Sequence, residues 1–350
     1  MVLLANNKGF DNKKYFSAQT KALLERVSKF SKLYLELGGK LLYDGHASRV
    51  LPGFDPKNKL KLIKKLRNKV EVLYCINAKE LEKGNTWSDT GLTLDKLALK
   101  ETNELKKNGI KVLGIVVCRF SGQKKAIDFK KKVKANGGKV FFTKEINGYP
   151  NNLKKVFGKQ GFAAQDWIKT TKQIIIVTGA GAGSGKMFLC MSQIYGDDKH
   201  KINSGYAKWE TFPIWNLPLE HPVNIAYEAA TADLGDKNMY DKRHEKAYGI
   251  RSVNYNRDIE NFDLLKKIIT QFVPQNNYMH KYKSPTDMGI SMAKKGITND
   301  TDVKEAAKNE ILRRYYFFKK KTLQGETNPK TLKRMKQLIK KAGLKTKPTV

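Results

Sequence analysis

The chain has 350 residues, of which 40% are hydrophobic, so it can bury one large core or two smaller ones and is not a disordered tail. A net charge of +35, from 68 basic and 33 acidic residues, would ordinarily point to nucleic acid or an anionic membrane surface. However, 58 of the basic residues are lysine and only 10 are arginine, the residue that reads bases and phosphates through its bidentate fork. We therefore expect lysine-rich solvated surfaces with nonspecific affinity for polyanions such as nucleic acid.

The cysteines and the apolar segments indicate a compartment. Cys75, Cys118 and Cys190 are too few and too widely spaced for a disulfide framework, and each lies in an apolar setting typical of a buried thiol. The apolar start of the chain is too short for the core of a signal peptide, and no window is long enough for a membrane helix. The sequence predicts a cytoplasmic protein without a membrane partner.

The first part of the chain alternates predicted helices and strands. Hydrophobic periodicity predicts helices at residues 13–30, 57–66, 94–107 and 124–135. Apolar, β-branched and aromatic runs predict strands at residues 34–42, 70–76, 112–117 and 140–143. Residues 44–56 are polar and rich in turn formers, so we expect a loop there. This alternation predicts an α/β fold, a doubly wound sheet with mainly parallel strands.

The stretch from Lys172 to Tyr195 combines a strand, a glycine-rich turn and a helix. Its β-branched run, residues 174–177, is typical of a strand buried on both faces of a parallel sheet. Glycines then occupy every second position and a lysine follows the last of them: Gly179, Gly181, Gly183, Gly185 and Lys186. Glycines let backbone N–H groups converge on an anion, and a helix N-terminus favours negative charge. The stretch predicts a phosphate site formed by Gly181, Gly183, Ser184, Gly185 and Lys186.

The match to the phosphate-binding motif G-x-x-x-x-G-K-[ST] is partial. Gly185 and Lys186 are in register, whereas Ala180 replaces the first glycine and Met187 replaces the Ser or Thr that would hold magnesium. The alternative is a tight strand-to-helix turn whose glycines serve only packing. The lysine directly after the last glycine favours an anion.

Ligands of doubly wound sheets bind beyond the carboxyl ends of the strands. We therefore expect four loops to converge on one crevice, namely residues 44–56, 84–91, 119–123 and 179–186. Arg49 and Arg119 lie in two of these loops and are candidates for bidentate contacts to phosphate or carboxylate. The alternative for both is an ion pair with a neighbouring helix.

A predicted helix at residues 223–234 carries the candidate catalytic carboxylates. Asn224, Glu228 and Thr231 fall at positions i, i+4 and i+7, so they share one face of this helix. Glu228 could act there as a general base or orient a metal-bound water. The alternative is that Glu228 pairs with one of the many lysines. Asp233, at the end of the same helix, is the second candidate.

The remainder of the chain is predicted to be helical. Helices are expected at residues 259–272 and 302–319, and the lysine-rich tail from residue 330 is marginal as a helix. We expect three parts: an α/β domain at residues 1–255, a helical subdomain at residues 256–325 and a basic tail at residues 326–350.

The histidines give no support to a zinc site. They never form H-E-x-x-H or a pair at i and i+4, and they are His46, His200, His221, His244 and His280. We therefore expect no metal held by the protein alone. Magnesium would arrive with a nucleotide and be held by carboxylates such as Asp89 or Asp233.

Several sequence blocks together carry a resemblance. They include G-A-G-A-G-S-G-K-M-F-L-C-M-S-Q, G-Y-A-K-W-E-T-F-P-I-W-N-L-P-L-E-H-P, L-E-L-G-G-K-L-L-Y-D-G-H-A-S-R-V-L-P-G-F-D-P and V-N-Y-N-R-D. The chain resembles, from about Gly9 to about Tyr316, a bacterial family known only as domain of unknown function 1846. The resemblance implies no established activity. Some members are labelled ATP-dependent zinc proteases, a label that the motifs of this sequence do not support. Members also extend further at the C-terminus than this chain.

Three functional hypotheses fit these observations. The first is a protein that binds ATP, another nucleotide or another phosphorylated small molecule at the glycine-rich loop, with magnesium, and transfers or hydrolyses a phosphoryl group. In it Lys186 neutralises developing charge, and Glu228 or Asp233 orients the nucleophile. The second is a basic nucleic-acid-associated protein in which the loop is only a turn. The third is a nucleotide-sensing scaffold without turnover, which Met187 makes credible. The sequence leaves the oligomeric state open.

Overall fold

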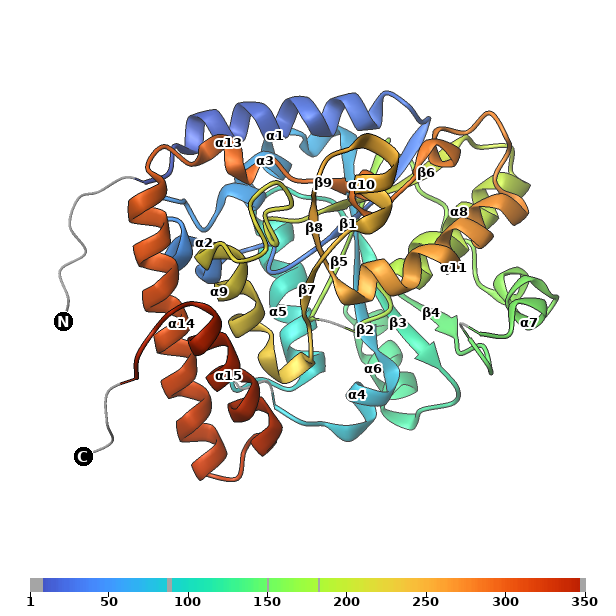
Figure 1. The fold of residues 1–350 in the computed structure, drawn as a ribbon. Helices are drawn as coiled ribbons and strands as arrows, with labels where there is room; N and C mark the ends of the chain where they lie inside the picture. The colour runs from blue at the N-terminus through green and yellow to red at the C-terminus, as the bar shows by residue number, and fades with distance from the viewer. Residues whose placement is uncertain (1–8, 87–89, 150, 182, 347–350) are drawn as a thin grey trace.

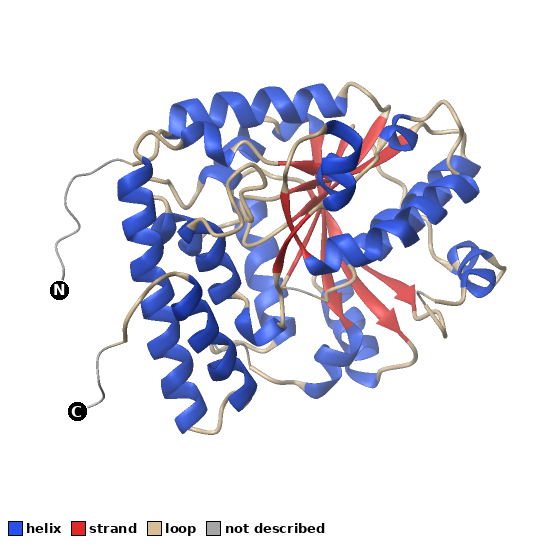
Figure 2. Cartoon of the chain, viewed as in Figure 1, coloured by secondary structure: helices blue, strands red, loops and turns tan. Residues whose placement is uncertain are grey.

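A parallel β-sheet forms the centre of the molecule, with helices packed around it (Figures 1 and 2). The computed structural model describes residues 9–86, 90–149, 151–181 and 183–346. Its seven strands follow the spatial order β4-β3-β2-β5-β1-β6-β9, and every neighbouring pair is parallel. The strands are β1 Lys32–Leu37, β2 Val70–Asn77, β3 Val112–Phe120, β4 Val140–Lys144, β5 Ile174–Gly179, β6 Ser204–Trp209 and β9 Gly289–Ile290.

The helices account for most of the remaining described chain. They are α1 Asn12–Val27, α2 Gly45–Val50, α3 Asn58–Lys65, α4 Ala78–Lys83, α5 Leu94–Lys107, α6 Lys124–Ala135, α7 Leu153–Phe157, α8 Lys186–Lys199, α9 Pro222–Ala230, α10 Lys242–Tyr248, α11 Asn256–Phe272, α12 Pro285–Met288, α13 Ala293–Gly296, α14 Asp300–Leu323 and α15 Pro329–Lys341. A small antiparallel pair lies apart from the main sheet and consists of β7 Asn238–Tyr240 and β8 Val253–Tyr255. The predicted α/β class, with a mainly parallel sheet and a helical C-terminal part, is confirmed.

The order of the strands explains why the glycine-rich loop is central. From β1 the chain passes to β2 and moves outward through β3 and β4, then returns as β5 between β2 and β1. The run Ile174 to Val177 of β5 is fully buried, as its β-branched composition predicts. β6 and β9 then extend the sheet on the other side of β1. The winding therefore reverses around β5, the kind of position where doubly wound folds bind ligands.

The expectation of a loop at residues 44–56 is wrong for residues 45–50, which form α2. The carboxylate of Asp44 caps this helix by accepting a hydrogen bond from the N–H of Ala47 at 3.1 Å. Ala47 and Val50 are buried in a second hydrophobic core, apart from the one around the sheet. An N-cap and an apolar face therefore outweigh the turn-forming composition of this segment.

The C-terminal part packs as helices against α9 (Figure 1). Residues 329–341, expected to be marginal as a helix, form α15, which buries Met335, Leu338 and Ile339 in the second core. The sheet also continues past residue 255, because β9 pairs with β6. The division into three parts at residues 255 and 325 stays a prediction. Among the described helices, none is both long and apolar enough to cross a membrane.

Candidate functional site

The glycine-rich loop joins the carboxyl end of β5 to the N-terminus of α8. Gly183 and Gly185 adopt positive φ angles of 73° and 89°, which glycine reaches without strain. Ser184 Oγ donates a hydrogen bond to the Gly181 carbonyl at 2.9 Å. Lys186 Nζ lies 3.3 Å from the same carbonyl and 3.5 Å from Ser184 Oγ, so the lysine side chain turns back over the loop.

Two of the glycines are required by close packing against the neighbouring strands. A Cβ atom at Gly179 would lie 2.3 Å from the Cys75 carbonyl oxygen on β2. A Cβ atom at Gly185 would lie 2.5 Å from Cys118 Cβ on β3. Packing therefore explains why glycine is needed at positions 179 and 185. This agrees with the alternative interpretation, in which the glycines of a tight strand-to-helix turn serve only packing. Gly183 differs, because nothing lies within 4 Å of a Cβ built there.

The N-terminus of α8 has no side-chain cap. Its N-cap is Gly185, which offers no side-chain acceptor to the first-turn N–H groups. Among the described residues, no carboxylate is within ion-pair distance of Lys186 Nζ, whose contacts are with the loop itself. Met187, which replaces the magnesium-binding hydroxyl of the motif, packs against the main core. The loop thus offers backbone donors and one cation, but no oxygen ligand at position 187.

All three thiols gather beneath this loop and are buried, as the sequence predicts. A hydrogen bond from Cys75 lowers the pKa of Cys118, and the nearby Lys186 acts in the same direction. Burial raises the pKa of Cys75 and of Cys190 well above the ordinary range of a thiol. Two of these thiol residues, Cys75 and Cys118, pack directly against glycines of the loop, Gly179 and Gly185.

The two candidate arginines have carboxylate partners. Arg119 Nη2 lies 2.9 Å from Glu145 Oε1, just beyond the end of β4. Arg49 Nε lies 3.0 Å from Glu310 Oε2 on α14. Arg49 therefore has the ion pair with a helix that the alternative interpretation describes, whereas the partner of Arg119 follows a strand. The contacts of both arginines to phosphate stay predictions. The loop of residues 84–91 is described only in part, and Asp89 lies outside the described residues.

The candidate catalytic carboxylates belong to the part of the molecule around α9. Glu228 is 1% exposed and pairs with Arg334 of α15 and, at 3.1 Å, with Lys341 Nζ. Asp233 lies in the short 3-10 turn after α9, Ala232–Leu234, and is exposed. The structure gives Glu228 two basic partners, as the alternative interpretation describes. The proposed catalytic roles of Glu228 and Asp233 stay predictions.

A buried charged cluster, which sequence reasoning missed, lies at the carboxyl ends of β1 and β6. Lys208 Nζ is at its centre, 2.5 Å from Asp258 Oδ2 and 3.0 Å from Glu210 Oε1. Tyr255 donates a hydrogen bond to Glu210, and Tyr206 donates one to Glu36 at 2.8 Å. We call these six side chains the charged cluster: Glu36, Tyr206, Lys208, Glu210, Tyr255 and Asp258.

Burial and mutual attraction set the protonation of the charged cluster. Burial raises the pKa of Asp258 to about 7, with Lys208 opposing the rise and Glu210 adding to it. Burial works to lower the pKa of Lys208, but the attraction of Asp258 and Glu210 holds it well above its ordinary value. One feature of the sequence could have indicated this cluster: β1 and β6 each carry a charged residue near the carboxyl end, Glu36 in L-E-L and Lys208 in K-W-E.

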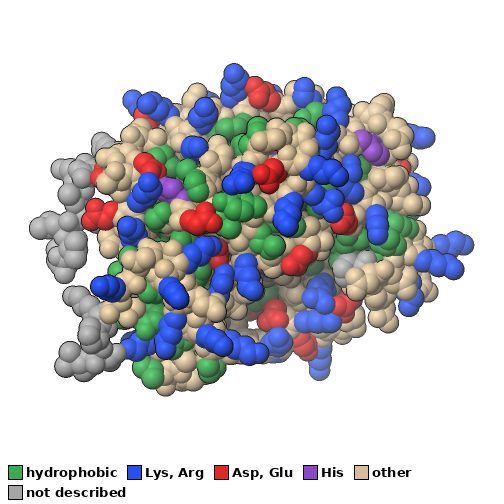
Figure 3. Space-filling view, in the orientation of Figure 1, with side chains coloured by type: hydrophobic (Ala, Val, Ile, Leu, Met, Phe, Trp, Pro, Cys, Tyr) green, Lys and Arg blue, Asp and Glu red, His purple; other side chains and the backbone are tan. Residues whose placement is uncertain are grey.

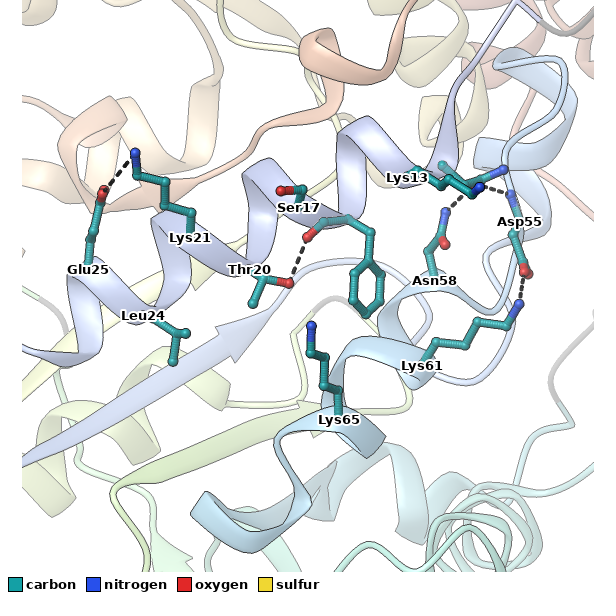
Figure 4. Close-up of a pocket in the computed structure, with 12 residues that line it drawn as sticks. Lys13, Ser17, Thr20, Lys21, Leu24, Glu25, Asp55, Asn58, Lys61 and Lys65 are labelled. Carbon is teal, nitrogen blue, oxygen red and sulfur yellow. Dashed lines mark hydrogen bonds and ion pairs between the residues drawn. The ribbon is translucent and has the colours of Figure 1, made fainter.

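A separate groove lies between α1 and α3 and measures about 860 Å³ (Figure 4). In Figure 4 the hydroxyl of Thr20 points to the backbone of its own helix, and Lys61 pairs with Asp55. The groove is open and is lined by residues of α1, by α3 and by Asp55. It contains none of the site residues predicted from the sequence.

These features define a doubly wound α/β protein with a glycine-rich loop at its centre. The chain belongs to the family described as Domain of unknown function DUF1846, N-terminal, whose sequence profile matches residues 8–343. It is similar to a UPF0371 protein of Clostridium botulinum (strain Alaska E43 / Type E3), 44% identical over 337 residues. A UPF0371 protein of Clostridium tetani (strain Massachusetts / E88) is 45% identical over 337 residues.

Each of these alignments covers 96% of this chain but 66% of the relative, so the chain spans just under two thirds of the relatives' length. Neither name describes an activity. The resemblance identified from the sequence blocks is confirmed.

Proposed function

We propose that this protein binds a phosphorylated small molecule, with nucleotides among the candidates, at the loop formed by residues 179–186. The observation that carries the proposal is the α8 N-terminus, which has no side-chain cap and has Lys186 at its mouth. Unsatisfied N–H groups, the helix dipole and an ammonium group all favour the same anion. The central position of β5 adds support, because ligands of doubly wound folds bind at that edge.

Binding without turnover fits this loop as well as catalysis does. Met187 occupies the position at which P-loop enzymes carry the Ser or Thr hydroxyl that holds magnesium, and its side chain packs against the core. Phosphoryl transfer or hydrolysis, with ATP and magnesium, therefore remains the finer prediction within this proposal. A nucleotide-sensing role needs only the binding step.

Ligand-dependent thermal stability tests the proposal. The purified chain would be heated with inorganic phosphate, ATP, ADP, GTP and sugar phosphates, with and without magnesium. A ligand present at 100 times its Kd stabilises the folded state by about 2.7 kcal/mol, which is a readable shift in melting temperature. We expect such a shift for at least one phosphorylated compound and its loss in Lys186→Ala.

Lys199→Ala is the matched control, because Lys199 is an exposed lysine at the opposite end of α8. That variant should keep the shift. Full-sized shifts in Lys186→Ala, or no shift with any phosphorylated compound, would contradict the proposal.

A further inference from the structure

We propose a second anion site, separate from the glycine-rich loop, where α2 packs against α14. Its ligand is inorganic phosphate or a small molecule that carries a phosphate group. Arg49 of α2 and Arg314 of α14 hold the ligand, and His46 lies beside them. None of these residues belongs to the loop of residues 179–186, so this inference does not rest on the proposed function.

A buried glutamate lies at the centre of this site. α2 lies beside α14 (Figure 1), and the side chain of Glu310 on α14 is only 1% exposed. Arg313, three residues further along the same helix, donates to both carboxylate oxygens, from Nε to Oε2 at 2.5 Å and from Nη2 to Oε1 at 2.8 Å. This is the bidentate pairing that arginine and carboxylate form best. The single negative charge of Glu310 is therefore already matched by Arg313.

Two further guanidinium groups contact the same carboxylate. Arg49 Nε lies 3.0 Å from Glu310 Oε2, and Arg314 Nε lies 3.1 Å from Glu310 Oε1. Each of these two arginines uses only its Nε, and no acceptor among the described residues takes a hydrogen bond from their Nη groups. The side chains of Arg49 and Arg314 are 40% and 19% exposed, so a ligand can reach them from solvent. They carry two positive charges that Glu310 does not balance.

The shifts in pKa show that these charges are crowded. Burial works to raise the pKa of Glu310, but hydrogen bonds from its neighbours and the charge of Arg49 hold it well below its ordinary value. Burial lowers the pKa of Arg314, and although Glu310 opposes this, the charges of Arg313 and Arg49 lower it further. One carboxylate thus does not offset the repulsion among the three guanidinium groups.

His46 is a second sign that the site is incomplete. It lies three residues before Arg49 on α2, so both side chains are on one face of that helix. Both ring nitrogen atoms are buried and have no hydrogen-bond partner among the described residues, and Nδ1 lies 3.5 Å from Glu310 Oε1. Burial lowers the pKa of His46, so the ring is neutral at pH 7 and carries one N–H group. A buried donor without an acceptor costs free energy, which an oxygen atom of a ligand would recover.

The charge of the site favours phosphate over a carboxylate. Asp44 also lies near His46, but its carboxylate is 3.1 Å from Lys59 Nζ and is neutralised there. A phosphate group carries a charge of about −1.5 to −2 at pH 7, which matches the two unbalanced arginines, whereas a carboxylate would leave one of them. Guanidinium groups also pair with phosphate oxygens bidentately, and a tetrahedral oxyanion offers oxygens to two helices at once.

Calorimetric titration with inorganic phosphate tests this inference, with acetate and chloride compared at matched ionic strength. The titration is made in the Lys186→Ala background, so that the glycine-rich loop does not contribute. We expect phosphate to bind there about tenfold or more tightly than acetate. Adding Arg49→Gln should weaken phosphate binding about tenfold or more, as loss of a hydrogen bond between charged groups implies. Glu310 keeps Arg313 and Arg314 in this variant, so the fold should survive.

Arg243→Gln is the matched control, because Arg243 is a half-exposed arginine with a carboxylate of its own, 2.7 Å from Asp263 Oδ2. It should leave phosphate binding unchanged. Melting without ligand shows whether each variant folds, and Arg314→Gln replaces Arg49→Gln if the latter does not. No phosphate binding in the Lys186→Ala background, equal binding of acetate and phosphate, or binding that survives Arg49→Gln would overturn this inference. A short RNA whose binding falls in Arg49→Gln, while that of phosphate does not, would assign these arginines to nucleic acid and overturn it as well.

Discussion

The glycines of the loop act through two different physical requirements. Gly185 has a positive φ of 89°, and a Cβ atom there would meet Cys118 Cβ at 2.5 Å. Gly183 has a positive φ of 73°, but a Cβ atom there would meet nothing within 4 Å. A side chain at position 185 is therefore disfavoured by both the backbone conformation and the packing. At position 183 it is disfavoured by the backbone conformation alone.

Alanine at these two positions should separate the two costs. A left-handed conformation costs an L-residue about 1–2 kcal/mol, and overpacking adds about 1–3 kcal/mol. We expect Gly185→Ala to lower the free energy of unfolding by about 2–5 kcal/mol and Gly183→Ala by about 1–2 kcal/mol. Denaturant-induced unfolding of the two variants measures the difference. If both variants lose the same free energy of unfolding, Cys118 must move aside for the added methyl group without an energetic cost.

The ion-pair partners of individual residues could not be predicted from the sequence. Glu228 was placed on the polar stripe of a helix from its spacing, but its partners Arg334 and Lys341 lie more than a hundred positions later in the chain. The charged cluster likewise joins residues of β1, of β6 and the position after it, of β8 and of α11. No local pattern specifies such pairs, because they depend on how distant elements pack.

At the scale of elements, locally determined segments were predicted well. The helices at residues 94–107 and 124–135 match α5 and α6 to the residue, since each has a regular apolar period and clear end signals. The buried strand β5 and the glycine-rich turn after it were also predicted. α2 was missed and α15 was expected to be only marginal, because short or lysine-rich helices are stabilised mainly by tertiary packing.

The packing of α15 gives a direct test of that explanation. Met335 is fully buried in the second core, whereas the adjacent Lys336 is exposed. Truncating a buried methionine to alanine typically costs about 2–5 kcal/mol, so Met335→Ala should destabilise the protein by that amount. Lys336→Ala should change stability by less than about 0.5 kcal/mol. Chemical denaturation compares the two, and a Met335→Ala variant as stable as the control would show that residues 329–341 behave as a tail.

At the scale of the whole molecule, the question is how the excess of lysine is distributed over the surface. Figure 3 shows Lys and Arg side chains dispersed over the displayed face, with Asp and Glu side chains between them. Arginines such as Arg49, Arg119 and Arg334 form ion pairs with carboxylates of the protein itself. A dispersed charge attracts polyanions at long range but provides no fixed reading surface.

The net charge of +35 therefore predicts weak and nonspecific binding to nucleic acid. Two RNAs of equal length and unrelated sequence should bind with equal affinity, and the affinity should fall by about a thousandfold or more between 50 and 200 mM salt if about six or more phosphates are neutralised. Fluorescence anisotropy across this salt range measures both quantities. Lys186→Ala should leave RNA binding unchanged, because one lysine of 58 contributes little to a spread charge. Selective binding of one RNA that persists at 200 mM salt would instead favour the nucleic-acid hypothesis, in which the glycine-rich loop is only a turn.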